Sequence, residues 1–241
     1  MKLLLTSNGI SNPSIQNAFV SLLGKPIEES NALFVPTGIY PFNGGPQIAW
    51  KALSGLMASS MCQLGWKSVG LFELTMLSGI QKEVWMKTIK EADVLLVWGG
   101  DPLFLSHYLK ESGLAEVLES MDHLVYVGVS AGSIATSKLF GESYSNYPVT
   151  IARPLTKQPI QFNTFQNTFV TAEGAGFVDF AIIPHYKAKN HDDASDDNAA
   201  IWASMLPCDV YAIDDQTAIK VVDETVEVIS EGEWEIFKQH A

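Results

Sequence analysis

A serine within a short turn of small residues is the side chain of this sequence best placed for covalent chemistry. Ser130 lies within Gly128-Val129-Ser130-Ala131-Gly132, between a buried strand predicted over 125–127 and a helix predicted from residue 134 onward. Glycines two places on either side allow a tight backbone that lifts the hydroxyl and directs helix N-terminal N–H groups at whatever the serine attacks. Because the same pattern occurs by chance in loops, the flanking strand and helix carry this interpretation.

A serine hydroxyl attacks a carbonyl carbon only when a base removes its proton, and histidine is the usual base near neutral pH. His185 ends a strand predicted over 177–184, in a turn that begins at Pro184. His191 is the second candidate. The other histidines fall within a helix, before the serine strand or in a tail, which is typical of structural or surface positions.

Short apolar runs alternate with segments of helical periodicity, which predicts an α/β fold with a mostly parallel sheet covered by helices on both faces. Ligands bind beyond the carboxyl ends of such strands, so we expect Ser130, His185 and the Gly99-Gly100 pair at one edge, although the glycine pair also fits a plain turn. Residues 141–166 are expected to form an irregular loop that walls the site. The strands are predicted over 3–6, 32–35, 69–74, 94–98, 125–127, 177–184, 210–213, 218–222 and 226–229, the last three joined by hairpins, and the longer helices over 13–24, 49–65, 81–92 and 103–110.

The composition excludes several classes of protein. With 241 residues and 47% hydrophobic content, the chain can bury a large core, and we expect one domain over residues 1–241. A net charge of −12 argues against nucleic acid and against an anionic membrane as partners. Cys62 and Cys208 have no Cys-x-x-Cys spacing, and no apolar run reaches the length of a signal peptide or membrane span. We therefore expect a soluble protein of the cytoplasm.

Four motifs together resemble the peptidase E family of serine peptidases, which includes aspartyl dipeptidases and the related cyanophycinases. They follow the family's order over most of the chain and read Phe34-Val35-Pro36-Thr37, Trp98-Gly99-Gly100-Asp101, Gly128-Val129-Ser130-Ala131-Gly132 and Ile183-Pro184-His185-Tyr186. The resemblance implies a three-layer α/β sandwich of the class I glutamine amidotransferase type and a short peptide as substrate, with no cofactor. It also implies Ser130 as the nucleophile, His185 as the base, and the N–H groups of Gly100 and Ala131 as the oxyanion hole.

The sequence departs from the family at the acidic member of the triad. Aspartyl dipeptidases have an aspartate fifteen places after the serine, where this chain has Ser145. Glu142 is the nearest carboxylate and becomes the predicted third member, with an exposed loop glutamate as the alternative. Asp192 is a further possibility.

Substrate recognition also departs from the family. An arginine after the histidine holds the substrate's aspartate in aspartyl dipeptidases, whereas Arg153 is the only arginine here. The sequence therefore does not support specificity for an amino-terminal aspartate. The carboxylates at 192, 193, 196 and 197 fit either a solvated helix start or recognition of an ammonium or basic side chain. The residues predicted to bind substrate are Gly99, Asp101, Arg153, Tyr186 and Asp192.

Three functions remain open at this stage. The first is a serine peptidase that acts on short peptides. The others are an unrelated α/β-hydrolase esterase that shares the serine turn, and a non-catalytic peptide- or small-molecule-binding protein that kept the fold and lost the acid. A homodimer is a further expectation, and no spacing of ligands favours a metal site.

Overall fold

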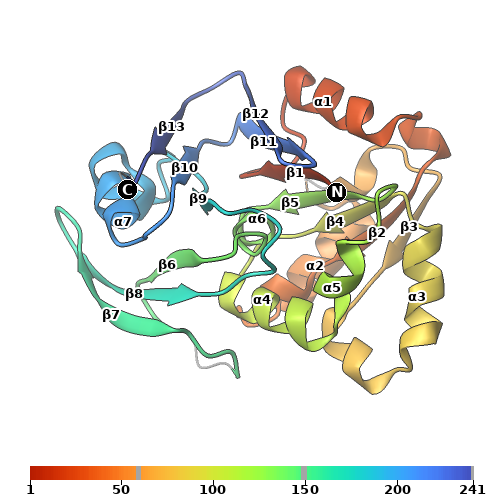
Figure 1. Cartoon of the computed structure of the whole chain (residues 1–241), viewed down its shortest axis with the longest axis horizontal. Coiled ribbons are helices and arrows are strands. Elements are labelled where there is room, and N and C mark those ends of the chain that lie inside the picture. Colours follow the sequence, from red (N-terminus) through yellow and green to blue (C-terminus); the bar gives the residue numbers. More distant parts are fainter. Residues whose placement is uncertain (58–60, 148–150, 240–241) are drawn as a thin grey trace.

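The computed structural model describes residues 1–57, 61–147 and 151–239. In this part of the chain, seven strands form a central sheet in the order β12-β11-β1-β5-β4-β2-β3 (Figure 1). The five strands from β1 to β3 in that order are parallel, and β11 and β12 are antiparallel to their neighbours. The strands span Lys2–Thr6 (β1), Asn31–Val35 (β2), Ser68–Leu71 (β3), Val94–Val97 (β4), Val125–Val129 (β5), Thr217–Val222 (β11) and Thr225–Ser230 (β12).

Helices cover both faces of this sheet because its strands are apolar on both sides. Leu3 and Leu5 of β1 pack with the buried faces of α3, α4 and α5, whereas Leu4 between them packs with α1 and α2. The predicted α/β fold with a mostly parallel central sheet is confirmed. The helices span Pro13–Leu23 (α1), Gly45–Ser54 (α2), Lys82–Glu91 (α3), Pro102–Glu111 (α4), Leu114–Leu118 (α5), Ala131–Ile134 (α6) and Asp196–Ser204 (α7), with 3-10 turns at Ile27–Glu29, Thr37–Ile39, Met61–Gln63, Leu74–Gly79 and Asp192–Ala194.

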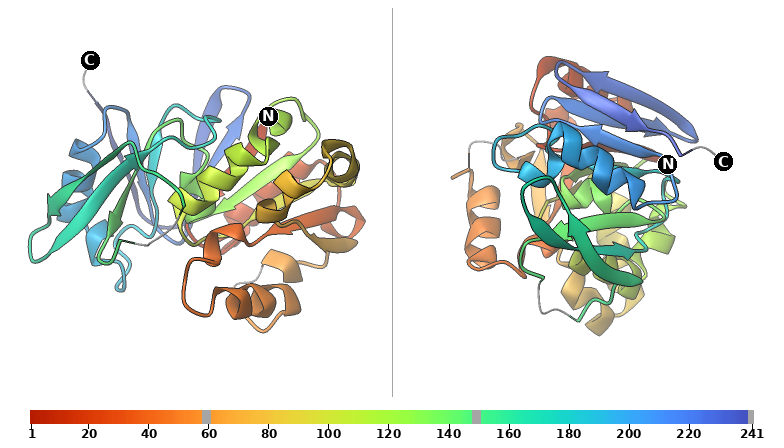
Figure 2. Two further views of the ribbon diagram at one scale, coloured as in Figure 1. Left: turned by 90° about the horizontal axis from the view of Figure 1, so that it is seen from below. Right: turned by 90° about the vertical axis from the view of Figure 1, so that its left-hand side faces the viewer.

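Two small sheets stand at the end of the molecule away from α3 (Figures 1 and 2). One has the order β6-β8-β7 and is antiparallel, and the other has the order β13-β10-β9. Aromatic residues of β8 and α7, such as Phe169 and Trp202, fill the core between them. The strands span Phe140–Tyr144 (β6), Thr156–Gln161 (β7), Gln166–Ala172 (β8), Ala181–Ile183 (β9), Val210–Ile213 (β10) and Trp234–Phe237 (β13).

The irregular loop expected over 141–166 is therefore wrong. β7 is exposed at five of its six positions and contains Pro159, so neither alternation nor propensity indicates a strand. It forms because β8 supplies partners from a distance, and its place at the edge of the sheet tolerates a residue without an N–H.

Other boundaries differ from the sequence prediction in smaller ways. The helix expected over 49–65 ends at Ser54, because Gly55 adopts a left-handed conformation, and part of the prediction, residues 58–60, lies outside the described residues. β11 and β12 form the expected hairpin, but β10 pairs with β9 and β13 instead of joining them.

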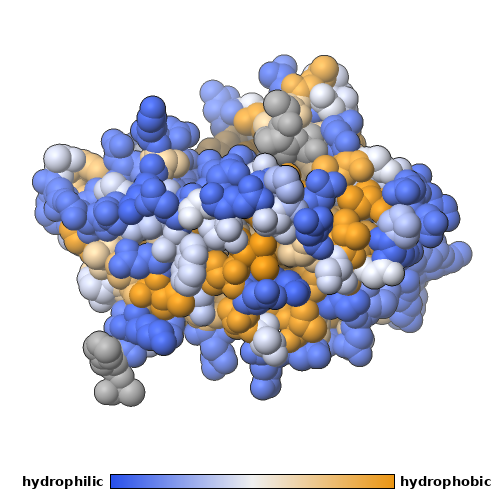
Figure 3. All heavy atoms as spheres, turned by 90° about the horizontal axis from the view of Figure 1, so that it is seen from above, coloured by the Kyte–Doolittle hydropathy of each residue, from blue (hydrophilic) through white to orange (hydrophobic). Residues whose placement is uncertain are grey.

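The surface is mixed in polarity. Apolar patches lie among hydrophilic side chains on the face shown in Figure 3. None of the helices in the described ranges is both long enough and apolar enough to cross a membrane.

Candidate active site

The turn after β5 holds Ser130 in a conformation that few residues adopt. Ser130 has φ 51° and ψ −114°, and its N–H donates to the carbonyl oxygen of Thr6 at 2.9 Å. A Cβ at Gly128 would lie 2.7 Å from the carbonyl oxygen of Gly132, and one at Gly132 would lie 2.2 Å from that of Val97. The two glycines therefore let α6 pack directly against β4 and β5, which fixes the hydroxyl at the carboxyl edge of the sheet.

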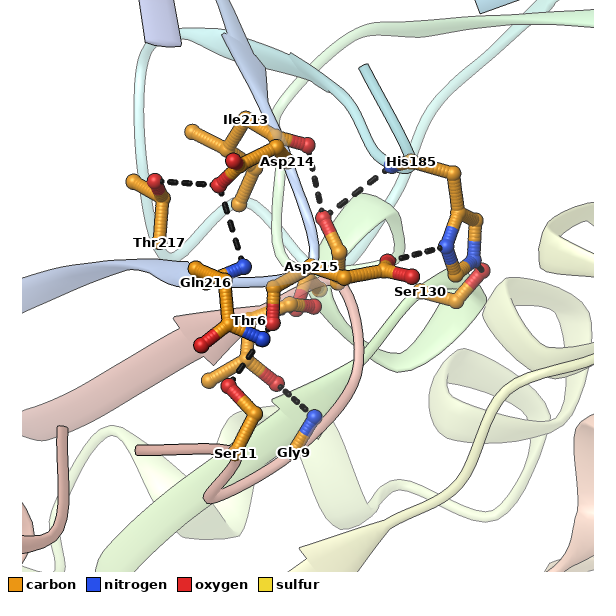
Figure 4. A network of polar contacts seen from close by, with 12 residues as sticks. Thr6, Gly9, Ser11, Ser130, His185, Ile213, Asp214, Asp215, Gln216 and Thr217 are labelled. Atoms are coloured by element: carbon orange, nitrogen blue, oxygen red, sulfur yellow. Dashed lines mark hydrogen bonds and ion pairs between the residues drawn. The ribbon is translucent and has the colours of Figure 1, made fainter. Parts of the chain in front are cut away.

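His185 reaches the serine from β9. Its backbone N–H donates to Ser7 Oγ at 3.1 Å, and that hydroxyl donates to the carbonyl oxygen of Ile213 at 2.8 Å. The ends of β1, β9 and β10 are thereby tied together beneath the ring. His185 Nε2 lies 3.0 Å from Ser130 Oγ. Figure 4 shows the imidazole ring beside the serine side chain. This distance allows proton transfer between hydroxyl and imidazole.

The carboxylate on the other side of the ring belongs to Asp215, two residues after β10. Asp215 Oδ1 lies 2.7 Å from His185 Nδ1, and the ring lies between Asp215 and Ser130 (Figure 4). The hydrogen bond from His185 holds the pKa of Asp215 below its usual value. Ser11 Oγ donates to the backbone carbonyl of Asp215 at 2.7 Å and fixes the loop that carries it.

The expected contact between Glu142 and His185 is wrong. The hydrogen bond that Glu142 makes within the described residues is with the backbone N–H of Ser143 at 3.0 Å, while Asp215 takes Nδ1 of the histidine. Burial, followed by repulsion from Asp193, raises the pKa of Glu142 well above its usual value. Glu142 lies on β6.

His191 packs on the face of the His185 ring. The ring centroids are 4.3 Å apart and the planes are inclined by 14°. Burial lowers the pKa of His191, and the neighbouring charge of His185 lowers it further. His191 therefore supports the imidazole of His185, and His185 is the ring bonded to the serine.

Ser130 and His185 both line a cavity of about 350 Å³. Asp101 lies on its wall as the cap of α4, with Oδ1 accepting from the Phe104 N–H at 2.7 Å and Oδ2 from the Tyr144 hydroxyl at 3.1 Å. The residues that line the cavity include Gly100, Ser130, Glu142, His185, His191 and Asp193.

The Gly99-Gly100 segment makes a close backbone contact with the turn after β2. Gly100 has φ 128°, and a Cβ there would lie 2.1 Å from the carbonyl oxygen of Gly38, which accepts the N–H of Asp101 at 2.7 Å. A Cβ at Gly99 would lie 3.2 Å from that of Ser130. In the described ranges, the N–H groups of Gly100 and Ala131 donate no hydrogen bond to the protein. Gly100 lines the cavity beside Ser130, whereas Ala131 is buried directly after the serine.

Comparison with known proteins gives the family. The sequence matches peptidase family S51 over residues 3–229. The chain belongs to this family. No curated protein shows a significant sequence match.

Two solved structures have a fold similar to that of this chain. This chain resembles a candidate peptidase E protein from Listeria monocytogenes EGD-e. The two are 19% identical, with a TM-score of 0.60, and the match covers 96% of this chain and 98% of that one. It also resembles a peptidase from an acI-B1 Actinobacterium, with 20% identity and a TM-score of 0.64, covering 98% of this chain and 90% of that one.

Three residues predicted to bind substrate are not among the described residues that line this cavity, although Asp192 lines a neighbouring pocket that shares His191 and Asp193 with it. The Tyr186 hydroxyl lies within hydrogen-bond distance of carboxylate oxygens of Asp196 and Glu235, and the side chain is buried in the core. Arg153 and Asp192 are exposed, and neither is among the described residues that line the cavity. Arg153 was predicted because it is the only arginine and lies in the segment expected to wall the site, Asp192 because it belongs to an acidic cluster, and Tyr186 because it follows His185.

The sequence contained a signal for Asp215, the carboxylate that the sequence analysis missed. Asp214 and Asp215 follow the strand predicted over 210–213, so a carboxylate at a strand's carboxyl end was visible. Nothing local linked that strand to His185, because the link is the pairing of β10 with β9. Within the described ranges, no group of His, Cys, Asp or Glu residues is arranged to hold a metal ion.

Proposed function

We propose that this chain is a serine peptidase that hydrolyses short peptides. The observation that carries the proposal is the line of contacts from Ser130 Oγ to His185 Nε2 at 3.0 Å, and from Nδ1 to Asp215 Oδ1 at 2.7 Å. A cavity of about 350 Å³, toward the small end of the range for ligand sites, supports a short substrate.

In the proposed reaction, Asp215 accepts the Nδ1–H of His185 and leaves Nε2 free to accept the proton of Ser130. Ser130 Oγ then bonds to the carbonyl carbon of the peptide, and the carbonyl oxygen becomes an anion. The N–H groups of Gly100 and Ala131 donate to that anion. His185 passes its proton to the nitrogen of the leaving amine as the C–N bond breaks, which leaves an acyl group on the serine.

Water completes the cycle by the same steps. His185 removes a proton from the water as the water oxygen bonds to the acyl carbon. The bond between that carbon and Ser130 Oγ then breaks, and His185 returns the proton to Oγ. The products are the free acid and the restored serine. These steps use only the side chains of Ser130, His185 and Asp215, the two backbone N–H groups and water.

A non-catalytic binding protein was proposed above because the acid expected after the serine is missing. Asp215 removes that reason, since a carboxylate does hold the His185 ring. The esterase alternative rested on the serine turn alone and has no support from the family.

A fluorophosphonate probe tests the proposal, because it reacts only with an activated serine. We expect labelling of Ser130, no labelling in the Ser130→Ala variant, and strongly slowed labelling in His185→Ala. Release of free amino acid from a mixture of dipeptides, measured by mass spectrometry, should follow the same pattern. A wild-type protein that takes no label and cleaves no peptide between pH 5 and pH 9 would refute the proposal.

A further inference from the structure

The cavity over Ser130 carries an excess of negative charge. Asp101, Glu142 and Asp193 line it, and no lysine or arginine is among the described residues that do so. The titratable groups of opposite sign are two imidazoles, those of His185 and His191. His185 is already paired with Asp215, and the charge of His191 acts on Asp193, so no cationic side chain of the described lining is left for Asp101 and Glu142.

These carboxylates differ in how far the protein satisfies them. Both oxygens of Asp101 accept hydrogen bonds, from the Phe104 N–H and from the Tyr144 hydroxyl. Glu142 accepts with Oε1 from the backbone of Ser143, and Oε2 has no hydrogen-bond donor in the described part of the chain. Asp193 is stabilised by the charge of His191 and by hydrogen bonds from the Ser143 side chain and from backbone N–H groups. Because an ionised, partly buried carboxylate gains most from a partner of opposite charge, Glu142 is the group that lacks one.

The pKa shifts of the three carboxyls also indicate a shortage of positive charge in the cavity. Burial raises the pKa of each carboxyl, and the charges of Asp193 and Asp101 raise that of Glu142 further. A substrate carboxylate in this cavity would add to the repulsion. A substrate cation would relieve it and would favour the ionised form of Glu142.

We propose that the cavity selects peptides with a cationic nitrogen beside the scissile bond, and that Glu142 is the acceptor for that nitrogen. This inference rests on the proposed function, because it assumes that the peptide bond lies over Ser130. The nitrogen is either the α-ammonium or the basic side chain of the residue that contributes the scissile carbonyl. Arg153, the only arginine and thus the one side chain able to hold a substrate carboxylate bidentately, is exposed and is not among the described residues that line the cavity.

Four peptides distinguish the two sources of the charge. They are Lys-Leu, norleucine-Leu, which lacks the side-chain ammonium, N-acetyl-Lys-Leu, which lacks the α-ammonium, and Asp-Leu, which adds a carboxylate. Release of leucine gives kcat/KM for each peptide. We expect removal of the recognised nitrogen to lower kcat/KM at least ~10-fold, as the loss of one partner of a partly buried charge pair does. Asp-Leu should be the poorest of the peptides with a free amino terminus.

Variants assign the effect to the cavity. Glu142→Gln should reduce the preference for the recognised nitrogen to within ~2-fold, since it keeps the size of the side chain and removes its charge. Glu83→Gln, which removes the same charge from an exposed site on α3, is the matched control and should keep the wild-type preference. Thermal unfolding reports whether each variant folds. If Glu142→Gln does not, Asp193→Asn provides the second test, with the same expectation in direction.

The outcomes separate this inference from the function beneath it. Hydrolysis that depends on Ser130 but proceeds equally on all four peptides, or fastest on Asp-Leu, overturns the charge preference and leaves the peptidase standing. A preference that Glu142→Gln and Asp193→Asn both leave intact overturns the role of the cavity carboxylates. Failure of the wild-type protein to cleave any peptide or to take the fluorophosphonate probe overturns both proposals together.

Discussion

Replacement of Asp215 by asparagine tests which carboxylate serves His185. Asparagine keeps the size of the side chain but loses the charge, and its amide can donate to Nδ1, which places the ring proton on Nε2. In that tautomer Nε2 cannot accept the proton of Ser130. The expected result is a loss of kcat with little change in folding.

The size of the loss follows from the exposure of the pair. The contact is short, at 2.7 Å, but the side chain of Asp215 is 40% exposed and that of His185 is 17% exposed. Water can therefore replace part of the stabilisation that a fully buried carboxylate gives. We expect kcat to fall ~10²- to 10³-fold, less than the ~10⁴-fold loss typical of a buried triad carboxylate; this loss is equivalent to about 2.7–4 kcal/mol of transition-state stabilisation.

The assay measures kcat with the best dipeptide and the rate of fluorophosphonate labelling. Asp122→Asn, the same change at an exposed residue between α5 and β5, is the control and should retain wild-type values. Equal rates for the two variants would refute the role of Asp215. Loss of labelling in Glu142→Gln with full labelling in Asp215→Asn would restore the glutamate that the sequence first suggested.

Three further predictions concern the surroundings of the triad. His191→Ala removes the ring stacked on His185 and should lower kcat roughly tenfold, whereas His191→Phe keeps the stack and should lower it less; equal losses would exclude a positioning role. Gly132→Ala places a methyl group 2.2 Å from a backbone oxygen and should lower the free energy of unfolding by about 1–3 kcal/mol or more. Gly79→Ala, where nothing lies within 4 Å, is the control and should change it little. Similar denaturation midpoints for the two variants would contradict this prediction. Folding raises the pKa of Glu142, so ionisation of this carboxyl opposes folding once the pH rises above its pKa in the unfolded chain. Glu142→Gln should therefore be more thermally stable than the wild type at pH 8 and lose that advantage near pH 4. A gain in stability that does not depend on pH would argue against this reasoning.

The sequence alone determined the elements that obey local rules. Continuous apolar runs specified the parallel strands, and Asn12 followed by Pro13 specified the start of α1, where the Asn12 side chain accepts from Ile15. The two glycines around Ser130 predicted the turn because only residues without a Cβ fit the backbone contacts made there. His185 was found because it ends a predicted strand.

Only the tertiary structure decided which side chains meet. Asp215 reaches His185 because β10 pairs in parallel with β9, and a single sequence does not encode such a pairing in any local pattern. The same holds for the β6-β8-β7 sheet, whose exposed strand β7 gains its hydrogen bonds from β8, and for Glu142, which that sheet carries into the cavity wall. Propensity and periodicity depend on neighbours along the chain, whereas the contacts that complete the site join strands whose partners only folding selects.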